Sequence, residues 1–455
     1  MSLLGPLFRW TAIEEIFSDR VRLQGMLDFE AALARAEAHT GIIPGRVAPI
    51  ITARCRAELF DINALARATA IAGNPAIPLI KQLTELVGKN NAEAKQFVHW
   101  GATSQDVVDT GFVLQLRQAL DHIEAELEKF SDSLAELAGK HRNTVVAART
   151  LMQQALPATF GLKVAGWLDA VDRHRARLSE TRRRALVLQF GGAVGTLAAL
   201  GNRGEGVAAA LSRELDLPLP SLSWHSHRDR VAEVATTLGL CAGTFGKLAR
   251  DLSLESQTEV AEVFEPSAPG RGGSSTLPHK RNPVTAAVVL SAATRVPGLV
   301  STVLSAMVQE HERGLGGWHA EWETIPEIIR LTGGALHHLN AIVLELDVDT
   351  AKMRENLEIT QGLIFAEAAQ MLLARSVGKQ TAHEIVEAAC IRARSGHRDL
   401  REVLARDAAV TKHWSAQDLD RLFDPREYLG EASRFIDNVL QAHANRRMKS
   451  AAGKE

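Results

Sequence analysis

A long stretch of the chain follows a seven-residue pattern of apolar positions. Between two distant prolines, Pro78 and Pro157, apolar residues recur at alternating spacings of four and three, at Leu116, Leu120, Ile123, Leu127, Phe130, Leu134 and Leu137. Acidic, basic and amide residues fill many of the positions between them. This pattern predicts a long helix that packs lengthwise against other helices.

Proline is scarce in the rest of the chain as well. Only 15 prolines occur in 455 residues, and none lies between residues 157 and 218 or between residues 326 and 425. Such gaps leave room for long helices, since proline interrupts a helix interior. Strict alternation of apolar and polar residues, bounded by tight turns, appears nowhere over a useful length, which disfavours a large sheet. The predicted fold class is therefore mainly α.

The longest apolar stretch of the chain lies near residues 288–308. Arg295 and Pro297 interrupt it, so it does not have the composition of a typical membrane span. We interpret it as a buried core helix and predict no membrane partner.

Glycine- and proline-rich segments divide the chain into three predicted domains. Short helices, broken at residues 41–49 and 73–78, are expected in an N-terminal domain of residues 1–107. A central bundle of long helices is expected over residues 108–352, and a helical C-terminal domain over residues 353–455. Residues 265–283, with the sequence EPSAPGRGGSSTLPHKRNP, predict a polar loop inside the central domain. Long loops in compact helical proteins are often functional.

The charge balance and the cysteines argue against several classes of protein. The chain has 52 Lys and Arg against 54 Asp and Glu, a formal net charge of −2, so it has no general attraction for nucleic acid. A basic run at residues 173–184 is interrupted by acidic and apolar residues, which fits a solvated helix face or a subunit contact. The N-terminus lacks the features of a signal peptide. The three cysteines are far apart, which favours a reducing, cytoplasmic compartment.

Two features of the second half of the chain leave their role open. His225 and His227 form an HxH pattern, but no third ligand follows at a recognisable spacing, so we predict no metal site. Trp318 and Trp322 fit either the lining of a pocket or the filling of a core.

Hydroxyl, amino and amide side chains gather in the loop at residues 265–283. Within nine residues the loop contains Ser274, Ser275, Thr276, Lys280 and Asn282. This combination suits an anionic ligand, because lysine supplies a positive charge and the other groups supply directional hydrogen bonds. The segment is not a phosphate-binding P-loop, because Lys280 follows His279 rather than glycine. By composition alone, a linker and a functional loop fit equally well.

The order of residues in this loop resembles a known family. GSSTLPHKRNP at residues 273–283 is similar to the signature loop of the fumarase/aspartase superfamily, GSSxMPxKxNP, with Leu277 in place of methionine. HWGATSQDVVDT at residues 99–110 and ARTLMQQALPATFG at residues 148–161 resemble its two other active-site regions, in the same order. The resemblance covers essentially the whole chain. It implies a three-domain, mainly helical protomer whose long helices form the twenty-helix core of a homotetramer, with active sites shared between subunits.

The resemblance also implies roles for the loop residues. By position, Ser274 would move the proton on the carbon next to a substrate carboxylate, while Lys280 and Asn282 would hold that carboxylate as its negative charge grows. A serine can act in this way only if nearby donors stabilise its alkoxide, because a free hydroxyl is a very weak base at neutral pH.

The other candidate residues are polar groups that the resemblance assigns to substrate binding: His99, Thr103, Ser104, Thr150, Gln153 and Ser275. The residues alone allow simpler interpretations. Thr103 and Ser104 precede Asp106 as a helix N-cap would, and His99 alone would more often be a packing histidine. Thr150 and Gln153 fit ordinary capping and packing.

The sequence departs from typical lyases of the superfamily at three positions. Those lyases read RTH in the second region, and the histidine pairs with a glutamate after the signature loop. Here Leu151 replaces the histidine and Ala287 the glutamate, while Asn74 aligns with a further histidine of adenylosuccinate lyases. A departing amine or hydroxide needs such an acid. A carboxylate does not, because its conjugate acid has a pKa of about 4. Leu151 and Ala287 therefore predict a reaction that forms or opens a lactone.

One branch of the superfamily has this chemistry, the bacterial 3-carboxy-cis,cis-muconate cycloisomerases of protocatechuate breakdown in the β-ketoadipate pathway. The sequence resembles that branch at residues 72–83, 149–155 and 312–322, which read AGNPAIPLIKQL, RTLMQQA and ERGLGGWHAEW. The resemblance implies addition of a carboxylate of a small polycarboxylate to an alkene, giving 4-carboxymuconolactone without a metal or organic cofactor. Two alternatives stay open: an elimination of the adenylosuccinate lyase type, and a non-catalytic tetrameric scaffold.

Overall fold

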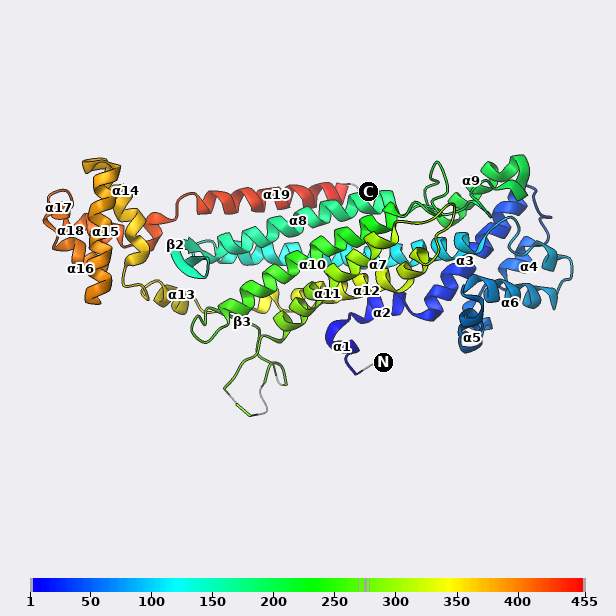
Figure 1. The fold of residues 1–455 in the computed structure, drawn as a ribbon, viewed down its shortest axis with the longest axis horizontal. Helices are drawn as coiled ribbons and strands as arrows, with labels where there is room; N and C mark the ends of the chain where they lie inside the picture. The colour runs from blue at the N-terminus through cyan, green and yellow to red at the C-terminus, as the bar shows by residue number, and fades with distance from the viewer. Residues whose placement is uncertain (1–2, 269, 274–275, 278, 453–455) are drawn as a thin grey trace. The chain divides into compact units, whose positions relative to one another are not determined.

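The computed structural model describes residues 3–268, 270–273, 276–277 and 279–452, and its fold is mainly α, as the sequence predicts (Figure 1). The helices are α1 Gly5–Phe8, α2 Thr11–Ile16, α3 Asp19–His39, α4 Ala48–Thr52, α5 Ile62–Ala72, α6 Ala76–Gly88, α7 Ser104–Lys140, α8 Phe160–Ala185, α9 Gly204–Leu215, α10 Asp229–Glu255, α11 Val284–Ala306, α12 Gly317–Asn340, α13 Thr350–Asn356, α14 Ala366–Val377, α15 Lys379–Gly396, α16 Leu400–Ala405, α17 Ala408–Thr411, α18 Ala416–Leu422 and α19 Ala432–Ala452. Short 3-10 helices are η1 Ala57–Leu59, η2 Ala94–Phe97, η3 Ala198–Arg203, η4 Val343–Glu345, η5 Leu363–Phe365 and η6 Pro425–Tyr428. The strands are β1 Val145–Thr150, β2 Gln153–Thr159, β3 Val263–Phe264 and β4 Asp347–Val348.

The heptad pattern forms the longest helix of the described chain, α7. All seven heptad residues, from Leu116 to Leu137, are buried, and none has more than 2% of its surface exposed. The predicted long helix is therefore confirmed, and its apolar stripe is the face that packs.

Helix α11 differs from the prediction of a buried core helix. Only 28% of its most apolar 18 residues are buried, and Leu304 keeps 47% of its surface exposed. One face packs inside the chain through residues such as Val289 and Val296, while the chain itself leaves the other face uncovered. The helix is long and apolar enough to cross a membrane by length and composition alone, as core helices of soluble proteins also are. Arg295 in its middle donates a hydrogen bond to Glu327 of α12 at 2.7 Å.

The chain divides into two compact units. Each unit consists of three separate segments, because the long helices contribute to both units. The first comprises residues 1–128, 173–246 and 288–338, and the second comprises residues 129–172, 247–287 and 339–455. The predicted division into three consecutive domains stays a prediction.

In the first unit, α3 and α7 approach each other closely where two glycines meet. A Cβ atom on Gly25 would lie 2.7 Å from the carbonyl oxygen of Gly111, and one on Gly111 would lie 2.9 Å from the backbone nitrogen of Met26. Only glycine permits this contact. It fixes α3 beside the first half of α7, and so determines which α3 side chains reach the start of that helix.

In the second unit, β1 and β2 form an antiparallel hairpin that the sequence analysis missed. Thr150 pairs with Gln153, and Leu151 and Met152 form the two-residue turn between them. Both turn residues have positive φ, 47° and 67°, although neither is glycine or asparagine. Val145 and Ala147 of the hairpin form an apolar cluster with three residues from later in the chain, Leu357, Ile364 and Phe365.

A separate apolar core joins the C-terminal helices α14 to α18 of the second unit. Its buried residues include Leu373, Val386, Leu400, Val410 and Trp414. Helix α18 begins with a complete capping box, in which Ser415 and Asp418 each accept from the other's backbone N–H. These local signals explain why short helices form in this part of the chain.

Candidate active site

The residues of the first predicted region lie at the N-terminus of α7. The backbone N–H of Thr103 donates to Asp106 Oδ2 at 3.0 Å, which is one half of a capping box. The Oγ1 of Thr103 accepts from Arg313 at 3.2 Å, and the Oγ of Ser104 accepts from Asn74 Nδ2 at 3.1 Å. The residues at the N-terminus of α7 are therefore also the candidate site residues, so the two interpretations do not exclude each other. Asn74, noted as a departure from adenylosuccinate lyases, touches a candidate residue directly.

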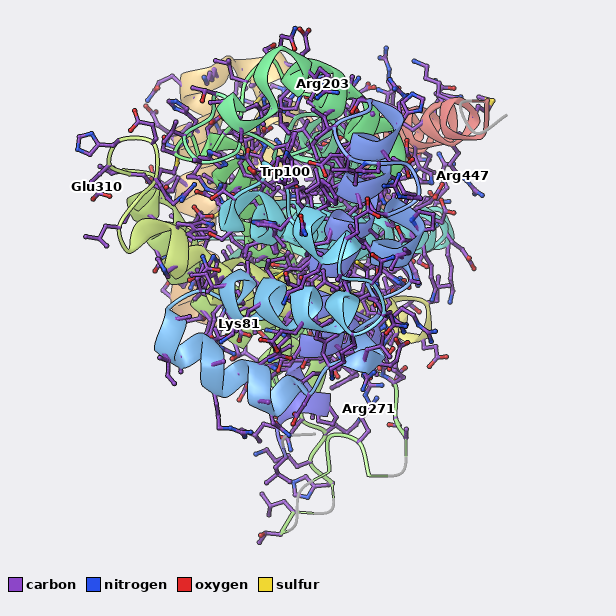
Figure 2. All side chains as sticks on the ribbon, turned by 90° about the vertical axis from the view of Figure 1, so that its right-hand side faces the viewer. Lys81, Trp100, Arg203, Arg271, Glu310 and Arg447 are labelled. Carbon is purple, nitrogen blue, oxygen red and sulfur yellow. The ribbon has the colours of Figure 1, made fainter. Side chains whose placement is uncertain are left out.

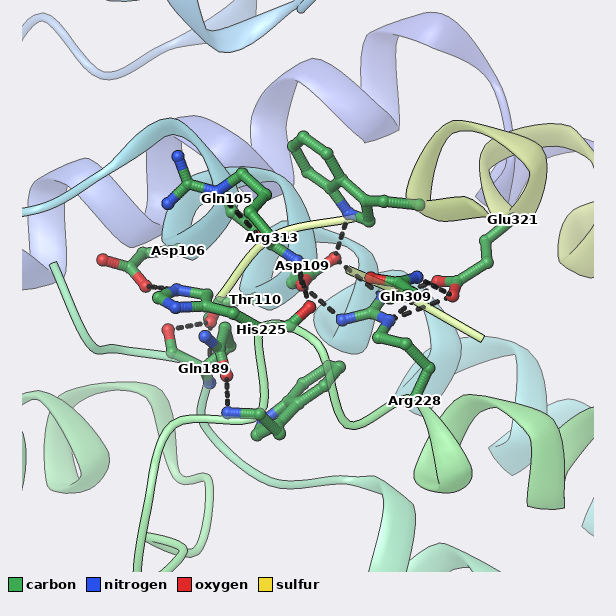
Figure 3. A network of polar contacts seen from close by, with 12 residues as sticks. Gln105, Asp106, Asp109, Thr110, Gln189, His225, Arg228, Gln309, Arg313 and Glu321 are labelled. Atoms are coloured by element: carbon green, nitrogen blue, oxygen red, sulfur yellow. Dashed lines mark hydrogen bonds and ion pairs between the residues drawn. The ribbon is translucent and has the colours of Figure 1, made fainter. Parts of the chain in front are cut away.

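Asp106 is fully buried and belongs to the polar network at this helix end, where Figure 3 shows it beside His225. Its Oδ1 accepts from the backbone N–H of Gly191 at 3.0 Å and lies 2.8 Å from Nε2 of His225, while Oδ2 accepts from the N–H of Gly192 at 2.9 Å. Gly192 has a φ of 68°, and a Cβ there would meet the carbonyl oxygen of Gly101 at 2.9 Å. Asp106 thereby joins the start of α7 to the glycine turn that follows α8.

His225 belongs to the HxH pattern considered as a metal motif. Its ring is buried and its Nε2 is used by Asp106. Among the residues that the structure describes, no group of three or more His, Cys, Asp or Glu side chains could hold a metal ion. Its position instead fits a structural partner for the carboxylate.

A second buried ion cluster lies one helical turn further along α7 (Figure 3). The Arg228 guanidinium donates to Asp109 at 2.7 and 3.1 Å and to Glu321 at 2.5 to 3.1 Å, and all three side chains are at most 5% exposed. Burial lowers the pKa of Arg228, but the two carboxylates outweigh burial and raise it overall. For Glu321 burial acts in the opposite direction and raises the pKa of the carboxyl group, in spite of its arginine partner. The cluster fixes α7, α10 and α12 to one another.

The two tryptophans left open by the sequence differ in their role. Trp318 is buried and its indole N–H donates to Asp109 at 2.9 Å, so it belongs to the core. Trp322 lines a pocket together with Arg22, Met26 and Pro75.

His99 lies just before this helix end and contacts a buried carboxylate. Its Nδ1 is 2.7 Å from Oε1 of Glu30 on α3, whose side chain is 1% exposed. Burial lowers the pKa of His99, but the charges of Glu30 and Asp106 and the hydrogen bond that the ring donates to Glu30 outweigh it and raise the pKa overall. His99 has a φ of 60°, and the next residue, Trp100, is 43% exposed (Figure 2).

Thr150 and Gln153 of the second predicted region face each other across the hairpin turn. Both are exposed in the single chain, and Leu151 between them exposes 97% of its surface. Arg149 anchors the base of the turn through two hydrogen bonds to the buried Glu262, at 2.9 and 2.7 Å. Glu262 also accepts from Asn356 at 2.8 Å.

Hydrogen bonds fix the two ends of the signature loop. Asn282 N–H donates to the carbonyl oxygen of Gly272 at 2.9 Å, and a Cβ on Gly272 would lie 2.6 Å from the Asn282 carbonyl oxygen, so glycine is required there. Glu265 accepts from the first backbone N–H groups of α11, and Arg271 (Figure 2) donates to Thr285 at 2.7 Å. Lys280 is exposed. Ser274 and Ser275 lie outside the described residues.

The candidate residues thus form groups in two units, and each group is defined within its own unit. The structure brings His99, Thr103 and Ser104 together in the first unit. Thr150 and Gln153 form a pair in the second unit, which also contains Lys280 and Asn282.

Sequence reasoning missed the partners of these groups. They are Glu30, His225 and Arg313, and they lie 69, 119 and 210 residues from the side chains that they contact. No spacing in the sequence signals contacts at such separations. The available sign in the sequence was an acidic residue within an apolar stretch, as for Glu30 in FEAALA at residues 29–34.

Comparison with known proteins places the chain in a family. Residues 10–298 match the lyase family, and residues 362–439 match the adenylosuccinate lyase C-terminus family. A 3-carboxy-cis,cis-muconate cycloisomerase of Pseudomonas aeruginosa is 54% identical over 97% of this chain and 96% of its own.

Solved structures agree. The crystal structure of 3-carboxy-cis,cis-muconate lactonizing enzyme from Pseudomonas putida matches with a TM-score of 0.93 at 53% identity, over 97% of this chain and 99% of that chain. The β-carboxy-cis,cis-muconate cycloisomerase from Acinetobacter calcoaceticus sp. ADP1 matches with a TM-score of 0.92 at 43% identity, over 97% and 100% of the two chains. The chain therefore belongs to the fumarase/aspartase superfamily of lyases, in its branch of 3-carboxy-cis,cis-muconate cycloisomerases.

Proposed function

We propose that the chain converts 3-carboxy-cis,cis-muconate to 4-carboxymuconolactone in protocatechuate degradation. One terminal carboxylate oxygen of the substrate adds to the alkene that is conjugated with the other terminal carboxylate, and forms the new C–O bond of a five-membered ring. The alkene electron pair moves toward a second carboxylate and gives an aci-carboxylate, which is then protonated at carbon. The product carries one ester and two carboxylates, so the overall reaction takes up one proton.

The observation that supports this function best is the high identity to cycloisomerases along nearly the whole chain. The chemistry of the second region agrees with it. Where other superfamily lyases have a histidine, Leu151 stands at the tip of the hairpin, and Ala287 stands on α11 in place of its glutamate partner. A carboxylate that adds to or leaves from carbon needs no protonation, so the reaction does not need this pair.

The proposed roles of the site residues follow the superfamily. Ser274 would deliver the proton to carbon, while Lys280 and Asn282 would stabilise the aci-carboxylate. The side chains proposed to bind the remaining carboxylates of the substrate are His99, Thr103, Ser104, Thr150, Gln153 and Ser275. Preorganised donors of this kind stabilise developing negative charge most when water is excluded.

We also propose that the functional unit is a homotetramer with shared active sites. The uncovered apolar face of α11 supports this, as does the exposed Leu240 on α10, because apolar faces of this kind usually mark subunit contacts. The exposed hairpin tip with Thr150 and Gln153 would then contribute to the site of another subunit.

We propose a cytoplasmic location as well. Cys55, Cys241 and Cys390 are free, which fits a reducing compartment.

An ultraviolet assay with 3-carboxy-cis,cis-muconate tests the function, with adenylosuccinate as the parallel substrate. We expect loss of the diene absorbance with formation of the lactone, and no cleavage of adenylosuccinate. Cleavage of adenylosuccinate instead would mean that another residue supplies the acid. Turnover of neither substrate would favour the scaffold alternative.

A further inference from the structure

The contact between His99 and Glu30 has an uncommon arrangement for a packing histidine. His99 adopts a left-handed backbone conformation, with φ of 60°, which costs a residue with a Cβ roughly 1 kcal/mol or more. This conformation accompanies a ring whose Nδ1 lies 2.7 Å from Glu30 Oε1. No hydrogen bond to Nε2, the other ring nitrogen, occurs among the described residues, and 18% of the side chain stays exposed. One nitrogen is therefore held from inside, and the other remains available from outside.

Glu30 is committed to this contact. It is 1% exposed, its Oε1 faces His99, and its Oε2 is buried without a hydrogen-bond partner among the described residues. A buried carboxylate is costly unless a positive charge compensates it. His99 is the group that can supply that charge, because no ion pair from Lys or Arg to Glu30 occurs in the described part of the chain.

The other titratable groups around this pair do not replace either partner. Asp106 on α7 acts on His99 through its charge, but its own oxygens are used by Gly191, Gly192, Thr103 and His225. Glu37 lies two helical turns along α3, and burial, followed by the charge of Glu30, raises its pKa to about 9, so it is a neutral carboxylic acid near pH 7. Burial also raises the pKa of Cys55 well above its usual range, so this thiol is neutral.

We propose that Glu30 is a positioning residue that holds His99 as an imidazolium, with Nε2 directed to the substrate site, so that His99 binds a carboxylate of the substrate as a fixed cation. The proposal rests on the proposed function, in that it places His99 in the substrate site. It deepens that function, since a fixed cation beside Thr103 and Ser104 would offset the charge of one of the three carboxylates of the substrate. The adjacent Thr103 and Ser104 at the N-terminus of α7 would then share the same carboxylate.

The test uses the full chain and compares Glu30→Gln with Glu37→Gln. The amide introduced by Glu30→Gln can still accept a hydrogen bond from Nδ1 but no longer favours the charged ring. Glu37→Gln replaces a buried group that is already neutral, on the same helix, and serves as the matched control. The first readout is the affinity for propane-1,2,3-tricarboxylate, measured by calorimetry between pH 5.5 and 8.5, because it does not depend on turnover.

For the wild type we expect an affinity that falls as the pH rises through the raised pKa of His99. In Glu30→Gln this fall should move by one pH unit or more to lower pH, which weakens binding at pH 7.5 about tenfold and restores it toward pH 5.5. Turnover should show the same shift in KM, with a smaller change in kcat. Glu37→Gln should follow the wild type.

Several results would overturn the proposal. An unchanged pH dependence in Glu30→Gln would do so, as would a loss that is equal at every pH, since that is the behaviour of a structural defect. If Glu30→Gln fails to fold, His99→Gln decides: binding should weaken without recovery at low pH, and unchanged binding contradicts the proposal. In a double variant, Glu30→Gln should add nothing once His99 is replaced. A wild type that binds the tricarboxylate in this way but does not convert the muconate would refute the proposed function alone.

Discussion

The ring nitrogen Nε2 of His225 lies 2.8 Å from the carboxylate of Asp106, and both side chains are buried although 119 residues separate them. The same carboxylate accepts from three backbone N–H groups, those of Thr103, Gly191 and Gly192. Asp106 is thus the acceptor around which the start of α7 and the turn after α8 are built. Its geometry determines where Thr103 and Ser104 point.

Replacing Asp106 by asparagine should therefore be costly. An amide has one acceptor oxygen and presents an N–H₂ group toward donors, so at least one buried N–H would lose its partner. We expect a loss of about 3 kcal/mol in the free energy of unfolding, measured by urea denaturation. Asp121→Asn is the control, because Asp121 is more than half exposed in its pair with Arg182 and should change stability by less than about 1 kcal/mol. Equal effects of the two variants would contradict this account.

Arg228→Met tests the second buried cluster. The substitution leaves Asp109 and Glu321 close together without a cation, in a site where all three side chains are at most 5% exposed. Removing one partner of a buried ion cluster typically costs about 3 to 5 kcal/mol, and we expect a loss of that size in thermal and urea unfolding. Arg434→Met, which breaks an exposed pair with Glu431, should cost less than about 1 kcal/mol. A mild effect of Arg228→Met would mean that the cluster is solvated.

The fold could be predicted where the signal is local and periodic. The heptad from Leu116 to Leu137 encodes the buried face of α7, because one side of a helix must be apolar to pack. The buried fraction of α11 could not be predicted, since composition reports that a helix is apolar but not which chain covers it. In α11 the pattern was right and the expected environment was wrong for the single chain.

The candidate site was predictable only where its residues adjoin a motif. Thr103 and Ser104 are adjacent in sequence and lie together at the start of α7, so the motif located them. Glu30, His225 and Arg313 reach the same place through tertiary packing, for instance through the close approach of Gly25 and Gly111. A linear pattern contains no record of such contacts. The resemblance supplied roles for motif residues but none for these partners.

The hairpin turn of the second region should be stabilised by residues that tolerate positive φ. Leu151 and Met152 both adopt left-handed conformations at an exposed turn, where asparagine and glycine are strongly preferred. The double variant Leu151→Asn and Met152→Gly should therefore raise the free energy of unfolding by about 1 to 2 kcal/mol, by removing backbone strain. Leu222→Asn, at another exposed leucine without positive φ, is the control and should not stabilise. A destabilised double variant would indicate that the two apolar side chains are covered in the native assembly.

Glu37 should make the stability of the protein depend on pH. Burial raises its pKa from 4.5 to about 9 in the folded state, and neither of its oxygens has a hydrogen-bond partner among the described residues. Between these two pH values the folded chain retains a proton that the unfolded chain releases. Stability from this group is therefore fully present below about pH 4.5 and falls as the pH rises, by about 1.4 kcal/mol for each pH unit up to about pH 9.

Glu37→Gln should remove this contribution, because an amide does not ionise. We expect the variant to unfold at higher denaturant concentration than the wild type at pH 8.5 and to show a flatter dependence of stability on pH between 5.5 and 8.5, at fixed protein concentration. Glu58→Gln, at an exposed carboxylate, should keep the slope of the wild type. If Glu37→Gln and the wild type lose stability in parallel, the carboxyl group is ionised and solvated in the folded protein. Glu37→Gln would then no longer be a neutral control for Glu30→Gln, since it would remove a charge near Glu30 instead of replacing a neutral acid.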